Sequence, residues 1–286
     1  MYFKLFKKHL TIIIAISVLM LTGCEISKRY VEKNVKLHLN NYGINNYKIL
    51  GAENDGERGS SNYGYIKINE PYQVNVRLAF DRETNQFISD ESDDVYLELF
   101  KKAYILQNPE VLKTSNQVIK KYHLMNKPGE VDQGKYNPLN DYYLDFSIQK
   151  DQENRLISEF RKDQNIDTTS LLPSLIGEEN KSPYPLNNEA VINFHYQFNL
   201  YKNKNNIPKV SEILNDFKES KVLTEGKYFI NVEVVSVDQE SSTYLSEDYP
   251  ENNILFVVDK DRNFKELRTL KRNGCLKYNE VSISDK

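Results

Sequence analysis

The sequence of 286 residues has no tryptophan and contains only two cysteines and four histidines. Two cysteines cannot build a disulfide scaffold or a cysteine-rich metal site. The 38 Lys and Arg residues are balanced by 41 Asp and Glu residues, which gives a formal net charge of −3 at pH 7. Binding of phosphate groups needs an excess of basic residues on at least one face, so we expect no nucleic-acid partner.

Motifs for common catalytic and cofactor-binding chemistry are also missing. The chain has no H-E-x-x-H pair, no G-x-S-x-G elbow and no glycine-rich phosphate loop after a strand. The segment from Asp259 begins like a calcium-binding loop, but Phe264 stands where the loop needs Gly and Leu270 where it needs Glu. We therefore predict no catalytic residues, no metal site and no cofactor.

The apolar segment near the start of the chain has the layout of a secretory signal. Lys4, Lys7 and Lys8 precede a run of twelve apolar and small residues that ends at Leu21. A helix of that length spans about 18 Å, which is too short for a bilayer core of about 30 Å. The next residues complete Leu21-Thr22-Gly23-Cys24, which resembles the lipobox of bacterial lipoproteins.

This resemblance implies that residues 1–23 are a signal peptide and that Cys24 becomes the lipidated N-terminus. A diacylglyceryl group on Cys24 brings two acyl chains, and two chains anchor stably where one binds only reversibly. We therefore expect a protein anchored by lipid to the extracytoplasmic face of the cell membrane. The alternative, an uncleaved anchor with an incidental cysteine, is disfavoured by the short apolar run.

The exported part is predicted to be α+β, with a first domain over 24–125, a linker over 126–140 and a second domain over 141–286. The linker has two Pro, two Gly and little apolar content. In the first domain we expect a helix over 25–42 that ends at Gly43, followed by extended segments. The expected strands are 47–50, 63–68 and 72–80, and further helices are expected over 95–104 and 109–123.

In the second domain the most regular pattern is a strand over 190–201, in which apolar residues alternate with Asn193, His195, Gln197 and Asn199. This alternation predicts one core face and one face open to solvent or to an interface. The other expected elements are a strand over 142–148, helices over 153–162, 168–176 and 208–222, and strands over 227–237, 254–258 and 264–270.

A helix followed by an antiparallel meander is therefore predicted in both halves. The turn from Asp81 to Phe87 also resembles the turn from Asp259 to Phe264. This likeness indicates either a duplicated unit or two hairpins that use the same Asp/Asn turn chemistry. The segments 64–69, 74–80 and 97–101 resemble the cystatin-like small domains of envelope lipoproteins from low-GC Gram-positive bacteria, most of which have no assigned activity.

The sequence favours a binding protein over an enzyme. The predicted contact surface is the polar strand face of Asn193, His195, Gln197 and Asn199 together with the loop around Tyr244 and Tyr249, because tyrosine gives contact area at low entropic cost. The partner would be the membrane through Cys24 and another envelope or secreted protein; the resemblance implies an immunity or accessory role. The alternative is an envelope hydrolase using paired carboxylates, which 41 acids permit although the chain lacks Trp for sugar stacking.

Overall fold

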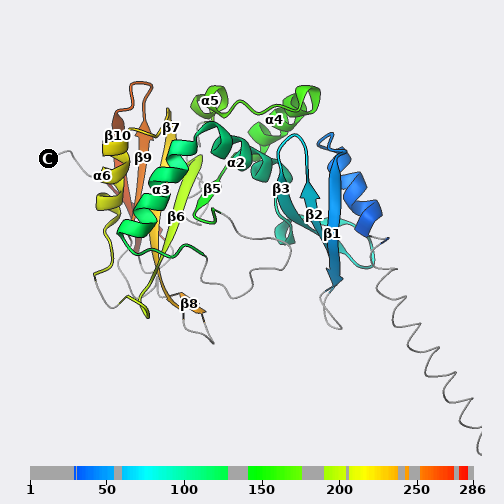
Figure 1. Cartoon of the computed structure of the whole chain (residues 1–286), viewed down its shortest axis with the longest axis horizontal. Helices are drawn as coiled ribbons and strands as arrows, with labels where there is room; N and C mark the ends of the chain where they lie inside the picture. Colours follow the sequence, from blue (N-terminus) through cyan, green and yellow to red (C-terminus); the bar gives the residue numbers. More distant parts are fainter. Residues whose placement is uncertain are drawn as a thin grey trace, which may run out of the picture. The chain divides into compact units, whose positions relative to one another are not determined.

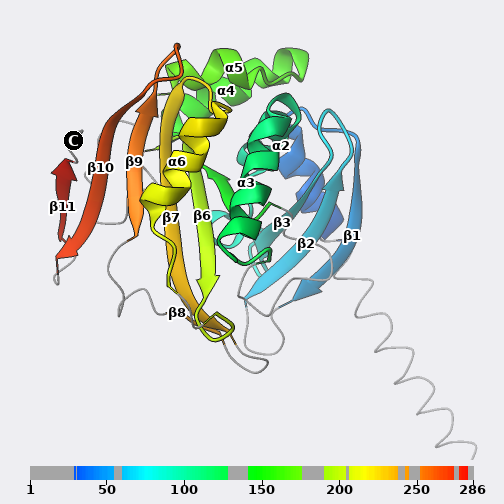
Figure 2. The same cartoon turned by 60° about the vertical axis from the view of Figure 1, so that its left-hand side comes forward.

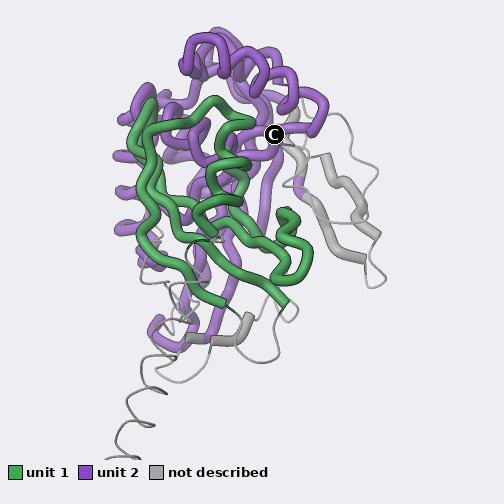
Figure 3. Tube along the Cα trace, turned by 90° about the vertical axis from the view of Figure 1, so that its right-hand side faces the viewer, with its two compact units in different colours: residues 1–95 green, residues 96–286 purple. Residues whose placement is uncertain are grey.

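In the computed structural model, the described residues are 29, 31–54, 60–127, 141–175, 190–203, 206–237, 242–244, 252–273 and 277–282. They form two compact units, residues 1–95 and 96–286 (Figure 3). Both units combine helices with sheets, so the predicted α+β class is confirmed. The signal peptide, Cys24 and the second cysteine, Cys275, lie outside the described residues.

The first unit is a helix followed by an antiparallel meander. The helix covers residues 31–40, and the sheet order is β1-β2-β3-β4 (Figure 1). The elements are β1 (Tyr47–Asn54), β2 (Ser61–Ile68), β3 (Val74–Asp81), β4 (Phe87–Ile88) and the 3₁₀ turn η1 (Ser89–Glu91). This is the predicted helix and meander, with β4 added. β4 has only two residues, which is too short for a periodic pattern.

Gly43 ends the helix as predicted. It has a φ of 72°, and its N–H donates to the Asn40 carbonyl while the Ile44 N–H donates to the Leu39 carbonyl. These two bonds are those of a Schellman cap, which satisfies carbonyls at the helix end. Ile44 is buried, so the cap also directs the chain from the helix into the core of the unit.

The helix packs on the sheet through Val31, Val35 and Leu39, all of which are buried. Contact is closest at Gly64 in the middle of β2. A Cβ atom at this position would lie 2.7 Å from Val31 Cγ1 and 3.2 Å from Val35 Cγ2. Because real carbon atoms do not approach so closely, only glycine lets the helix lie directly on β2.

The second unit begins with α2 (Val95–Gln107), whose first residue closes the first unit, and contains a mixed sheet. The sheet order is β11-β10-β9-β7-β6-β5, and β8 pairs with β7 (Figure 2). Among the described strands only β6 and β7 pair in parallel, and the chain between them crosses over through α6. The remaining elements are α3 (Pro109–Lys121), β5 (Leu144–Phe146), α4 (Lys150–Asp163), α5 (Thr168–Leu171), η2 (Leu172–Ser174), β6 (Ile192–Asn199), α6 (Val210–Ser220), β7 (Gly226–Val237), β8 (Ser242–Tyr244), β9 (Asn253–Val258), β10 (Phe264–Asn273) and β11 (Lys277–Ser282).

The chain divides after Val95 and not within 126–140, so the predicted boundary is wrong. The reason is that α2 packs on the second sheet. Tyr104 of α2 lies edge-on to Phe146 of β5 with ring centroids 5.2 Å apart. Ser115 of α3 accepts a hydrogen bond at 3.2 Å from the buried Tyr196 hydroxyl of β6. The linker signal is compositional and cannot show which sheet a preceding helix covers.

In both of the similar turns, the first Asp carboxylate accepts a hydrogen bond from the backbone N–H two residues later. The Asp81 carboxylate accepts from the N–H groups of Glu83 and Thr84, and the Asp259 carboxylate accepts from those of Asp261 and Asn263. A residue with positive φ follows in both turns, at 61° for Asn85 and 62° for Arg262. One turn of the meander after α6 therefore resembles one turn of the first unit in its Asp-centred hydrogen bonding. Duplication and convergence on Asx-turn chemistry both remain consistent with it.

Packing at Gly64 gives a stability prediction. Gly64→Ala should destabilise the protein by about 1–3 kcal/mol, because the added methyl group overlaps Val31. Val31→Ala removes the overlapped atom, so the double variant should lose less than the sum of the two single losses. The measurement is urea-induced unfolding of the four proteins of this cycle. Strictly additive losses would show that the contact does not limit the approach of the helix.

Candidate binding site

The predicted polar face of β6 is not exposed. Asn193, Gln197 and Asn199 have 0%, 8% and 2% of their surface accessible. β6 lies between β5 and β7, and the amides are engaged there. The Asn193 side chain donates to Ser147 Oγ at 3.1 Å, and the Gln197 side chain donates to Glu233 Oε2 at 3.3 Å. The expectation of an open contact face is therefore wrong, because the amide N–H groups find partners within the fold. Asn193 Oδ1 is buried and has no hydrogen-bond partner among the described residues.

His195 shares this environment. Its ring lies 5.7 Å from that of Phe229 in β7. Burial lowers its pKa, and the nearby charge of Asp145 partly opposes this shift. Of the two predicted tyrosines, Tyr244 pairs with Val235 where β8 meets β7, and Tyr249 lies outside the described residues. The structure thus brings the four β6 residues together, but as part of the interior.

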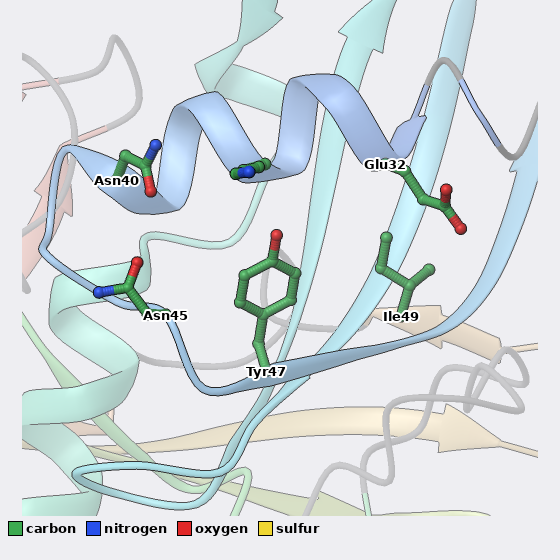
Figure 4. Close-up of a pocket in the computed structure, with 6 residues that line it drawn as sticks. Glu32, Asn40, Asn45, Tyr47 and Ile49 are labelled. Carbon is green, nitrogen blue, oxygen red and sulfur yellow. The ribbon is translucent and has the colours of Figure 1, made fainter.

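An open groove lies in the first unit between the helix and β1. It has a volume of about 640 Å³ and is lined by Glu32, Lys36, Asn40, Asn45, Tyr47 and Ile49. Figure 4 shows Tyr47 and Ile49 directed from β1 toward the helix, with Glu32 and Asn40 above them. The three helical residues follow one another at intervals of four and therefore line one side of the helix. They adjoin the buried stripe that packs on β2.

The chemistry of the groove is polar and electrically balanced. It offers one carboxylate, one ammonium group, two amides and a phenol. Partial burial raises the pKa of the Tyr47 phenol, and the negative charge of Glu32 adds to this effect. Tyr47 therefore stays protonated at neutral pH and can donate a hydrogen bond. The sequence signal, an Asn, Lys and Glu at four-residue spacing, resembles any solvated helix face, so it did not predict this groove.

β1 is an edge strand, and within the described residues its only strand partner is β2. On the opposite side of the same sheet, β4 is short, and residues 92–93 contact β3 beside it. The Arg77 N–H donates to Asp93 Oδ2 at 2.6 Å, and the Ala79 N–H donates to Ser92 Oγ at 2.7 Å. Two backbone donors of β3 are thus occupied by side chains. Among the described residues, no strand pairs with the outer edge of β1.

The other side of the helix carries His38, whose ring stacks on Phe87 at a centroid distance of 3.9 Å. Burial lowers the pKa of His38 from 6.5 to about 4, and the charge of Asp94 partly opposes this. Its Nε2 atom is buried and has no hydrogen-bond partner among the residues that the structure describes. The fold therefore holds the neutral imidazole as an aromatic packing group.

Two further findings concern the described part of the chain. No group of three or more His, Cys, Asp or Glu side chains there is placed to hold a metal ion. Among the same residues, no helix has both the length and the apolar character needed to cross a bilayer.

Comparison of the chain with protein-family models, with curated proteins and with solved structures gives no match.

His38 makes stability depend on pH. Since the folded state holds its pKa near 4 and the unfolded value is 6.5, the unfolded chain gains a proton first as the pH falls. The contribution of His38 to the free energy of unfolding is fully present above pH 6.5, and it is lost as the pH falls from 6.5 to 4. The loss from this residue is expected to be about 1–2 kcal/mol, less than the full shift implies because the ring is only half-buried.

His38→Phe keeps the stacked ring and removes the proton, so it should flatten this part of the pH dependence. The measurement is urea unfolding of both proteins at pH 7.5 and 4.5. His195 is present in both proteins, and its contribution cancels in the comparison. Equal pH-dependent losses in the two proteins would contradict the assignment to His38.

Proposed function

We propose that this chain is an exported lipoprotein, held at the outer face of the cell membrane by Cys24, that acts by binding another protein. The leader with its Leu21-Thr22-Gly23-Cys24 sequence supports the anchor. The open edge of β1 carries the binding proposal. The partner is an envelope or secreted protein, and the cystatin-like resemblance is consistent with an immunity or accessory role.

The edge supports binding because the outer edge of a sheet offers a row of backbone donors and acceptors. An extended segment of a partner can add to such an edge as a further strand, and backbone hydrogen bonds then supply affinity. Natural sheets normally protect their edges, and on the opposite side residues 92–93 occupy two backbone donors of β3. The groove lies along the open edge, so alternate side chains of an added strand would project toward it.

The alternative of an envelope hydrolase requires two carboxylates facing the same bound substrate. Of the described residues that line the groove, one has a carboxylate, Glu32. Its other polar groups are amides, a lysine and a tyrosine that stays protonated. These groups suit hydrogen bonding to a partner more than acid and base catalysis by a carboxylate pair.

Site-specific photo-cross-linking tests the binding edge in the full, membrane-attached chain. A photoreactive amino acid in place of Lys48, which is exposed on β1, should give an adduct with a protein of the producing bacterium. The matched control replaces Lys113, which is exposed on α3 in the second unit. Mass spectrometry identifies the adduct. Equal labelling from both positions, or none from Lys48, would overturn the binding role of the edge.

The anchor has a separate test. Cys24→Ala removes the only thiol of the lipobox, so the variant should incorporate no labelled fatty acid and should leave the membrane fraction. Cys275→Ser is the matched control, since it removes the other cysteine and should keep both the label and the membrane attachment. Labelled fatty acid in the Cys24→Ala protein would refute the lipobox assignment.

A further inference from the structure

We infer that the open edge of β1 pairs with the β1 strand of a second copy of the same chain, antiparallel and about a two-fold axis between Leu50 and Gly51. The inference deepens the proposed function, since it uses the same open edge and names an occupant for it. A two-fold interface requires a surface that is complementary to itself. The sequence and the bulge of β1 provide this complementarity.

The bulge determines which side chains share a face. Along β1 the pairing with β2 shifts between Ile49 and Gly51, so Leu50 is an extra residue. Lys48 pairs with Lys67 and Glu53 with Tyr63 on β2. Because Lys67 and Tyr63 are an even number of positions apart, Lys48 and Glu53 lie on one face. In a strand without a bulge, two residues five positions apart would lie on opposite faces.

The other face of β1 looks toward the helix and carries Tyr47, Ile49, Ala52 and Asn54. Ile49 pairs with Ile66 and Ala52 with Gly64, the glycine on which the helix lies. The bulge therefore divides β1 into two halves of matching pattern. Positions equally distant from the Leu50–Gly51 bond point to the same face, which is the condition for pairing two copies about that point.

In the paired register each contact joins side chains of compatible chemistry. Lys48 lies opposite Glu53 of the second copy, and two-fold symmetry repeats this ion pair. On the helix face Ile49 lies opposite Ala52, and Tyr47 opposite Asn54. Opposite charges and apolar pairs placed directly across two antiparallel strands stabilise the pairing. Both charged side chains are exposed, and the Tyr65 hydroxyl hydrogen-bonds to the Glu53 carboxylate at 3.1 Å on that face.

Pairing of this kind joins two sheets of the first unit into one continuous sheet. It also closes an edge that would otherwise be free to bind other strands without selectivity. The groove lies on the helix face beside the paired strands, so Tyr47 would gain a polar neighbour in Asn54 of the second copy. The opposite side of the sheet, where residues 92–93 occupy two backbone donors of β3, takes no part.

Charge reversal gives the first test, on the full chain purified in detergent. Light scattering after size-exclusion chromatography should find dimers of the wild-type chain. Lys48→Glu alone and Glu53→Lys alone should each weaken dimerisation at least about tenfold, since each puts like charges opposite one another twice. An equimolar mixture of the two variants should dimerise again, because every pair is then of opposite charge.

Lys67→Glu is the matched control, because Lys67 lies on the same face but on β2, one strand away from the edge. It should leave dimerisation unchanged. A simple loss of folding cannot produce recovery in a mixture of two defective proteins. Failure of the mixture to recover would overturn the register.

Disulfide trapping gives the second test, in membranes of cells that make the lipidated chain. Lys48→Cys and Glu53→Cys are placed in separate copies, each with Cys275→Ser. Directly opposite residues have Cβ atoms about 4.5–5.5 Å apart, close enough for a disulfide after small adjustment. Oxidation should link the two copies when they are co-expressed, and should link neither variant to itself. Linkage in the single variants would contradict the two-fold register.

The outcomes separate this inference from the proposed function. If the wild-type chain is monomeric and the co-expressed cysteine variants do not link, the second copy is excluded as the occupant. An adduct from the photoreactive group at Lys48 with a different protein would then still support a binding edge. If no adduct forms either, the edge is not a binding surface and both proposals fail.

Discussion

The close contact between the helix and Gly64 is the constraint from which the geometry of the first unit follows. Because Gly64 has no side chain, the helix lies directly over β2, near one margin of the sheet. The buried side chains of the helix then pack on β2. The polar side of the helix lies over β1 and forms one wall of the groove. A bulkier residue at position 64 would raise the helix and remove the wall of the groove. The shape of the groove therefore depends on a single glycine in a strand.

The sheet of the second unit is buried differently from that of the first. Its sheet is covered on one face by aromatic side chains of the helices, as Phe194 of β6 shows with its ring 5.0 Å from that of Phe217 in α6. The other face of β6 carries amides that are nevertheless buried. The Asn193 and Gln197 side-chain N–H groups donate to Ser147 and Glu233, while Asn193 Oδ1 has no partner among the described residues. Such buried polar groups fix the register of neighbouring strands, since a shift would leave them unsatisfied.

Local pattern predicted most of the elements. The helix over residues 31–40 and the strand β6 follow from periods of 3.6 and 2, and Gly43 follows from helix-end chemistry. Long-range properties were not predictable in this way. The parallel pairing of β6 with β7 and the packing of α2 on the second sheet depend on contacts between distant residues. The alternation in β6 could not distinguish amides facing water from amides facing Ser147 and Glu233.

The proposed lipid anchor would keep the open edge of β1 close to the membrane. Seven residue steps separate Cys24 from Val31, and an extended chain covers at most about 3.5 Å per step, so the helix would begin within about 25 Å of the lipid. The β1 edge would then remain in a thin layer above the membrane. Copies confined to this layer meet at a far higher effective concentration than free copies, so a short strand interface can suffice. Confinement also restricts foreign partners to proteins that reach the membrane surface.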